Sequence, residues 1–214
     1  MNENLMNENN LIRLNEGQVK AASEVLTRAY YDYPPYAYLF PNLDERSRNL
    51  PVLFEALLRF GVMYGEVYGI SAKLEGVARW LPYWEAETTE EKIIQCLGGK
   101  RQRREFASIM GLEFFKRLGT ITKHMERCQK QYANFSHWYL GPIGVDPVYQ
   151  GRGYASLLLK AKLAELDKEN VSCYLETNTD KNIAIYQHLG FEVVEEGVFP
   201  DTNVPIWIMM RKNE

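Results

Sequence analysis

The sequence predicts a single α/β domain that is interrupted by a helical insertion. Strand-like and helix-like periods alternate over residues 11–82 and again from residue 137 onward, whereas residues 85–135 show helical spacing of apolar residues only. No internal repeat or linker divides the 214 residues, so we assign residues 11–214 to one domain. Residues 1–10, which read MNENLMNENN, are rich in Asn and Glu and are expected to form a disordered tail.

The first part of the chain is predicted to form strands and helices ahead of the insertion. We expect strands at Leu11–Leu14, Glu66–Ser71 and Leu74–Pro82, and helices at Gly17–Tyr30 and Arg48–Tyr64. The prolines of residues 31–41 should exclude a regular helix there. The insertion is expected to break near Gly98-Gly99 and again near Gly119.

The last part of the chain is predicted to alternate strands and helices. Strands are expected at His137–Val145, Val171–Thr177, Phe191–Val194 and Pro205–Met210, with helices at Gly153–Lys168 and Lys181–Leu189. Pro142 cannot donate a ladder hydrogen bond, so its strand should be bulged or splayed, unless it is an edge strand. Splaying would leave main-chain groups of Ile143 to Val145 free to bind something other than a strand.

Composition narrows the classes of function. The formal net charge of −3 argues against a nucleic-acid-binding protein, and no apolar stretch is long enough to span a membrane. The 3 cysteines are far apart and form no CxxC pair, and the 3 histidines are scattered, so we expect no metal site. The cysteine usage and the absence of a leader-like N-terminus favour a reducing, cytoplasmic location.

The most informative segment runs from Ile143 to Ala155, where a strand ends, a short turn follows and a helix begins among small residues. Backbone N–H groups at a helix start have no partner within the helix and lie at the positive end of its dipole. Small residues at Gly151, Gly153 and Ala155 would let an anion approach them. The pattern therefore suits a diphosphate, although glycines after a strand are also common in ordinary turns.

Residues 150–155, which read QGRGYA, fit the Q/R-x-x-G-x-G/A signature of the GNAT family of N-acetyltransferases. Residues 182–191, NIAIYQHLGF, resemble the downstream end of the same domain, and Trp138–Arg211 looks most like puromycin N-acetyltransferase-like members. The resemblance implies a GNAT fold, in which a mixed, mostly antiparallel sheet of six or seven strands is flanked by helices and splayed at the fourth strand. It also implies acetyl-CoA as cosubstrate. The residues implied to bind it are Ile143, Gly144, Val145, Gln150, Gly151, Arg152, Gly153, Tyr154, Ala155, Ser156 and Asn182.

The resemblance further implies that Tyr186 is the acid that protonates the departing CoA thiolate. The base is open, because the strand His137–Val145 carries no glutamate where many family members have one. Glu176, which ends the next strand, and His137, which begins the splayed one, are the two candidates. Cys173 alternates onto the face opposite Glu176, so a covalent acetyl-enzyme is not expected.

The predicted function is direct transfer of acetyl from acetyl-CoA to the amine of a small molecule. Two alternatives remain at this point: a non-catalytic module that senses acyl-CoA, and an acetyltransferase acting on protein N-termini or lysines. The insertion at residues 85–135 is expected either to cover the acceptor side of the cleft or to form the contact of a homodimer.

Overall fold

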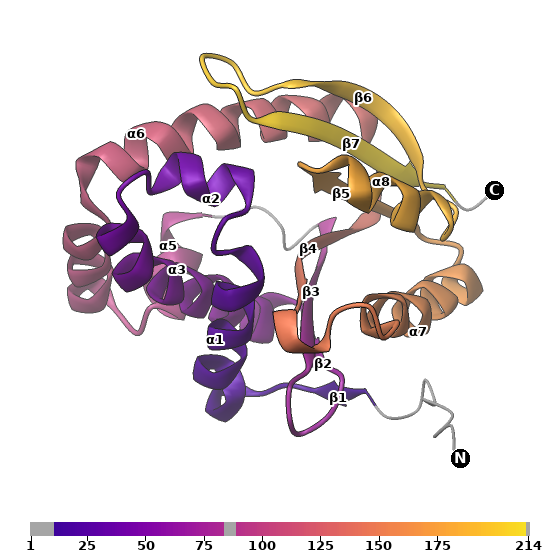
Figure 1. Ribbon diagram of the computed structural model, residues 1–214, viewed down its shortest axis with the longest axis horizontal. Helices are drawn as coiled ribbons and strands as arrows, with labels where there is room; N and C mark the ends of the chain where they lie inside the picture. The colour runs from indigo at the N-terminus through magenta and orange to yellow at the C-terminus, as the bar shows by residue number, and fades with distance from the viewer. Residues whose placement is uncertain (1–10, 84–88, 213–214) are drawn as a thin grey trace.

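In the computed structural model, which describes residues 11–83 and 89–212, the strands form one seven-stranded sheet in the order β1-β2-β3-β4-β5-β7-β6 (Figure 1). The strands are β1 (Ile12–Arg13), β2 (Glu66–Gly69), β3 (Gly76–Pro82), β4 (His137–Val145), β5 (Ser172–Thr177), β6 (Glu192–Val198) and β7 (Pro205–Arg211). Every neighbouring pair is antiparallel except β4 and β5, which are parallel. The predicted mixed, mostly antiparallel sheet is thus confirmed.

Helices cover both faces of this sheet. They are α1 (Val19–Tyr30), α2 (Pro34–Leu39), α3 (Leu43–Tyr64), α5 (Glu90–Cys96), α6 (Lys100–Tyr132), α7 (Tyr154–Glu169) and α8 (Asp180–Gln187), with short 3-10 turns η2 (Glu16–Gln18) and η3 (Pro147–Tyr149). Figure 1 shows α1 and α7 on opposite sides of β3 and β4. Within the described ranges, no helix combines the length and apolar character needed to cross a membrane.

Two large hydrophobic cores result, one on each face, and a smaller cluster contains Phe60, Leu81 and Cys96. Residues of β5 alternate between them, because successive side chains of a strand point to opposite faces. Tyr174 packs with α1, α3 and α6, whereas Cys173 and Leu175 pack with α7 and α8. The apolar face of the insertion, represented by Phe114, therefore belongs to the larger core and does not project from the domain.

The sheet forks between β4 and β5. The two strands pair over four positions, ending at Leu140 opposite Leu175, while β4 continues alongside β3 as far as Val145. Between the pairs Ala78–Ile143 and Trp80–Leu140, one residue of β3 stands opposite Gly141 and Pro142 of β4, so β4 carries the predicted bulge. Proline cannot donate to a ladder, and a bulge locally disrupts pairing, so the fork begins at this point. β4 has a neighbour on each side over residues 137–140, so the alternative of an edge strand is wrong.

Two predictions for the N-terminal helices are corrected by the structure. Residues 34–39 form helix α2 despite their prolines, because Pro34 and Pro35 occupy its first turn, where no N–H is needed. Helix α3 begins at Leu43, five residues earlier than predicted, after Asn42 caps it by accepting from the Glu45 N–H at 3.0 Å.

In the insertion, the predicted break at Gly98-Gly99 is present, but α6 next breaks at Gly111 (φ 75°) and not at Gly119. The predicted tail at residues 1–10, and residues 84–88 at the start of the insertion, lie outside the described residues.

Candidate active site

A cavity of about 450 Å³ opens at the fork between β4 and β5. It is bounded by the end of β4, the turn and first residues of α7, and helix α8, with α1 contributing from the N-terminal part of the chain. The predicted residues that line it are Ile143, Gly144, Val145, Gln150, Gly151, Gly153, Tyr154, Ala155, Ser156, Asn182 and Tyr186. One concave space thus collects nearly the whole predicted cofactor set together with the predicted acid.

The floor of the cavity is the unpaired edge of β4. Alternation directs the main-chain groups of Ile143 and Val145 toward the fork and those of Gly144 toward β3. The Ile143 groups are occupied, because the Tyr30 hydroxyl donates to its carbonyl at 2.6 Å and accepts from its N–H at 3.2 Å. The Val145 carbonyl accepts from Gln150 Nε2 at 3.1 Å. The Ile143 groups and the Val145 carbonyl thus pair with side chains and not with a strand, as expected, whereas the expectation is wrong for Gly144, which pairs with β3.

The wall of the cavity is the start of α7. Gly151 and Gly153 have φ values of 78° and 79°, and Gly153 precedes the helix without a side-chain cap. The amides of the first turn therefore face the cavity with the positive end of the helix dipole. A Cβ at either glycine would meet no atom within 4 Å. The positive φ values favour glycine at both positions, and no protein atom would obstruct a side chain there.

Tyr186 lies on the opposite wall, on α8. Its side chain is buried, and its ring packs edge-on against Phe191 with a centroid separation of 5.8 Å. Burial raises the pKa of Tyr186 well above its ordinary value of 10.0, so the phenol stays protonated at neutral pH. Asn182, one turn earlier, donates from Nδ2 to Thr177 Oγ1 at 3.1 Å, which fixes the start of α8 to the end of β5.

Glu176 lies at the fork itself, as the residue of β5 that follows the last pair with β4. It faces the same side of the sheet as Tyr174, away from the cavity that holds Tyr186. Burial raises its pKa to about 7, while the phenols of Tyr139 and Tyr174 and the guanidinium of Arg79 act in the opposite direction. A carboxyl group with a pKa near 7 can both accept and release a proton at neutral pH.

Arg79 lies on the same side of the sheet as Glu176 and hydrogen-bonds to the main chain at the start of the fork. Its Nε donates to the carbonyl of Gly141, and its Nη1 donates to the carbonyl of Leu57 at 3.3 Å. Desolvation lowers the pKa of this buried guanidinium, and the nearby Tyr139 and Glu176 counteract that effect. The two faces of the fork therefore differ in chemistry, with a carboxyl and a guanidinium on one side and helix amides on the other.

Besides Glu176, two further predicted residues do not line the cavity. His137 begins β4, six residues before Ile143 and so roughly 20 Å away along the strand. It is fully buried, its Nδ1 lies 2.7 Å from the Phe135 carbonyl and its Nε2 3.2 Å from Gln129. A role as base at the fork does not fit this position, and it is not a surface residue either. Arg152 is exposed, with its guanidinium 5.4 Å from the Tyr149 ring centroid.

Eight residues that line the cavity were not predicted as site residues: Ala29, Tyr30, Tyr33, Tyr149, Leu159, Thr179, Lys181 and Ile185. Tyr33 accepts from the Asn178 N–H at 2.8 Å, which links the end of α1 to the end of β5. The only sequence feature that pointed to the tyrosines was their high density in residues 30–38. Their position at the cavity depends on how α1 packs against the fork, which the sequence pattern does not show. Lys181, on α8, adds a cation to the cavity lining, which would favour a phosphate.

Comparisons with known proteins identify the family of the chain. A family model described as an acetyltransferase (GNAT) domain matches residues 80–193. An uncharacterized N-acetyltransferase of Schizosaccharomyces pombe is 24% identical over 207 residues, which cover 94% of this chain and 83% of that protein.

Solved structures share the fold. The Corynebacterium glutamicum protein described as histone acetyltransferase HPA2 and related acetyltransferase has a TM-score of 0.64 at 20% identity, covering 96% of each chain. Arylalkylamine N-acetyltransferase 2 of Aedes aegypti has a TM-score of 0.64 at 16% identity, covering 95% of this chain and 98% of its own. The family model spans more than half of the chain, and the chain therefore belongs to the GNAT family of acetyltransferases.

Proposed function

We propose that this acetyltransferase transfers acetyl from acetyl-CoA to the amine of a small molecule, by direct attack in a ternary complex. The observation that carries the proposal is the fork between β4 and β5, with uncapped helix amides and a protonated Tyr186 on one face and Glu176 on the other. A donor bound on the first face and an acceptor entering from the second would meet where the strands part.

The residues around the cavity fit acetyl-CoA, which supplies the acetyl group as an activated thioester. The amides at the start of α7 and the ammonium of Lys181 would hold its diphosphate. The Val145 N–H, directed toward the fork, would hydrogen-bond the extended arm or the acetyl carbonyl, as an oxyanion donor does. Each of these groups is on a strand or a helix end, so the reacting carbon would be held in one place.

The acid and the base are assigned to opposite faces. Glu176 would take a proton from the acceptor ammonium, since its pKa of about 7 suits proton transfer near neutral pH. Tyr186 would donate its phenolic proton to the sulfur as the carbon–sulfur bond breaks. The buried cysteine of β5, Cys173, lies in the core that faces α7, and burial raises its pKa well above 9.0. It is therefore a poor nucleophile, which supports direct transfer.

The acceptor face favours a small amine with a single charge. Helix α6 packs over this face, with Phe114 stacked on Phe40 at a centroid separation of 5.0 Å, so no long groove for a protein chain is expected. Arg79 lies beside Glu176, and its positive charge would repel a second ammonium. Among the similar structures, one is a polyamine N-acetyltransferase of Drosophila melanogaster and another an arylalkylamine N-acetyltransferase. We expect the acceptor of this protein to be closer to an arylalkylamine than to a polyamine.

A panel of acceptors tests the proposal. Purified protein with acetyl-CoA is supplied with tyramine, agmatine, spermidine or a lysine-containing peptide, and thiol release is measured alongside product mass. We expect tyramine to give the highest kcat/KM and the peptide the lowest. If acetyl-CoA binds but no amine is acetylated, the protein is a sensor. If the peptide is the best acceptor, the small-molecule assignment fails.

A further inference from the structure

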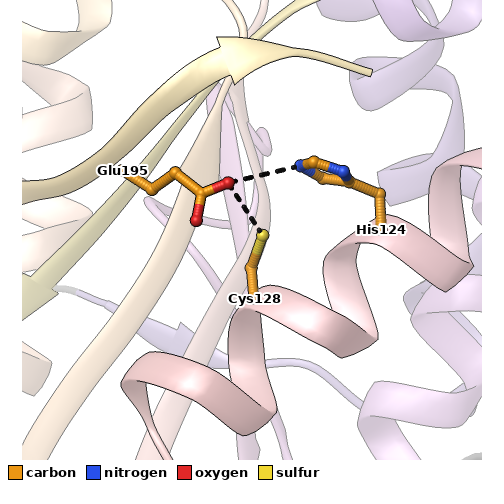
Figure 2. Close-up of side chains that lie close together, drawn as sticks. All are labelled: His124, Cys128 and Glu195. Atoms are coloured by element: carbon orange, nitrogen blue, oxygen red, sulfur yellow. Dashed lines mark hydrogen bonds and ion pairs between the residues drawn. The ribbon is translucent and has the colours of Figure 1, made fainter. Parts of the chain in front are cut away.

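Outside the cavity, three metal-ligating side chains converge between α6 and β6. His124 and Cys128 lie one turn apart on α6, and Glu195 faces them from β6 (Figure 2). Glu195 Oε1 is 3.8 Å from His124 Nε2 and 3.6 Å from Cys128 Sγ, and the three donor atoms all lie within 4.8 Å of one another. Residues four apart share one helix face, so the two α6 donors point to the same place.

One polar atom of this cluster lacks a hydrogen-bond partner. The Nε2 atom of His124 is buried and makes no hydrogen bond with any described residue, although its side chain retains 11% of its exposure. Figure 2 shows this nitrogen directed toward the Glu195 carboxylate. A buried nitrogen without a hydrogen bond is costly, and an unseen ion is one of the few explanations for it. Cys128 is fully buried beside it.

We propose that His124, Cys128 and Glu195 form a binding site for Zn²⁺ or a similar thiophilic divalent cation, which fastens α6 to β6. Tetrahedral coordination at usual bond lengths separates donor atoms by about 3.3–3.6 Å, so adjustments of a few tenths of an ångström to about 1 Å close the site. A thiolate and an imidazole select zinc, cobalt or copper over magnesium and calcium. The fourth position would be open to water or a small ligand.

Two of the three side chains are already in the protonation state that a metal ion requires, and the thiol must lose its proton. Burial lowers the pKa of His124, so the imidazole is neutral at pH 7, and Arg127 contributes to this effect. The Arg127 and Tyr132 side chains lower the pKa of Glu195 despite burial, so the carboxylate is ionised. Burial raises the pKa of Cys128 to about 11, so its thiol is protonated without metal. Binding would therefore form an S–metal bond, break the S–H bond and release one proton to solvent.

Arg127 supplies the positive charge when no ion is bound. Its guanidinium contacts Glu195 Oε1, and its Nη2 lies 3.1 Å from Cys128 Sγ. The side chain is 47% exposed and its Nη1 already donates to Gln131 at 2.8 Å, so it can turn outward. A divalent cation would take its place. Arg127 thus competes with the metal ion for Glu195, so its removal should strengthen metal binding. A substitution that merely disturbed the fold would weaken binding instead.

The site would act on the acceptor side of the sheet. Glu195 and Glu176 both pair with Ile208 of β7, so they share a face two strands apart, roughly 10 Å. Helix α6 crosses the same face. An ion at the site would therefore fix the position of α6 relative to the strand that carries Glu176. This inference stands whether or not the proposed acceptor is correct.

The test is metal binding by tag-free, full-length protein after chelator treatment. Zn²⁺ is titrated in competition with a chromophoric chelator, and Co²⁺ is added separately because thiolate ligation gives a near-ultraviolet charge-transfer band. We expect one ion per chain, no comparable binding of Mg²⁺, and affinity that rises with pH because the thiol must lose its proton. Absence of stoichiometric Zn²⁺ binding, or a Co²⁺ spectrum without the thiolate band, would overturn the proposal.

Variants locate the site. We expect His124→Gln and Cys128→Ser each to weaken Zn²⁺ binding at least tenfold, while Cys96→Ser and His188→Gln leave it unchanged. Arg127→Gln should tighten binding at least threefold. If the control variants lose as much affinity as the site variants, or if Arg127→Gln binds no better than the parent protein, the ion does not occupy this cluster.

Discussion

Replacing Glu176 with Gln should stabilise the fold while it removes activity. The side chain keeps its shape but can no longer ionise. The difference between a pKa of about 7 in the folded protein and the ordinary 4.5 corresponds to about 3 kcal/mol, at about 1.4 kcal/mol per pH unit. Because the folded pKa is raised, this stability is fully present below pH 4.5 and is lost as the pH rises to about 7.

The wild-type protein should therefore lose up to about 3 kcal/mol of unfolding free energy between these two pH values through Glu176, and the Gln variant should not. Above pH 7 the variant should be the more stable, by roughly 6–12 °C in Tm for a chain of this size. Thermal unfolding of both proteins from pH 4.5 to 8.5 measures the difference. Glu192→Gln, an exposed change on β6, is the matched control.

Activity should move in the opposite direction. The wild-type kcat/KM should fall about tenfold per pH unit below pH 7 as the base is protonated, and Glu176→Gln should reduce kcat by about 10²–10⁴ and flatten this limb. The combination is diagnostic, because a merely structural role would not yield a more stable and inactive enzyme. A variant with more than half of wild-type activity and an unchanged pH profile would refute the assignment.

Four further substitutions probe the fork and helix α6. Tyr186→Phe should lower kcat by roughly 10–1,000-fold with acetyl-CoA affinity nearly unchanged in calorimetry; equal kcat would return the residue to a packing role. Gly153→Ala should cost about 1–2 kcal/mol, seen as weaker acetyl-CoA binding and a lower Tm, since φ there is 79°. Gly119→Ala, within α6, should instead gain about 0.5–1 kcal/mol. Phe115→Ala should change the ranking of acceptors at unchanged molecular mass if α6 covers the acceptor; a shift from dimer to monomer with the same ranking would contradict the cover.

The sequence predicted the elements whose signals are local. Strand β4 has its predicted bounds because apolar alternation and the following turn are contiguous. Helix α2 was missed because a pair of prolines reads as a break, although both fit the first turn of a helix. Local sequence also does not show why α6 breaks at Gly111 and not at Gly119. Asn49 of α3 donates to the Ile109 carbonyl at 3.1 Å, next to the break, so a tertiary contact stabilises it there.

The site was predictable to the same extent. The residues from Ile143 to Ser156 are contiguous, and their pattern carries its own physical reason. Tyr30 was not found, because it reaches Ile143 from 113 residues away and only the packing of α1 brings them together. The pairing of His124 and Cys128 with Glu195 was missed for the same reason. The expectation of no metal-ligand spacing considered cysteines in pairs, whereas these donors come from a helix and a distant strand.

Tyr30 explains how a sheet can remain forked. An unpaired strand edge inside a protein leaves buried N–H and C=O groups, which cost free energy unless something replaces the missing strand. Here one phenol both donates to and accepts from Ile143, so a single side chain does at that residue what β5 does at Leu140. Only Val145, one alternation further along, keeps its N–H directed at the cavity. The fork is thus closed where it starts and open where the cosubstrate would lie, which confines the reacting group to a short stretch of β4.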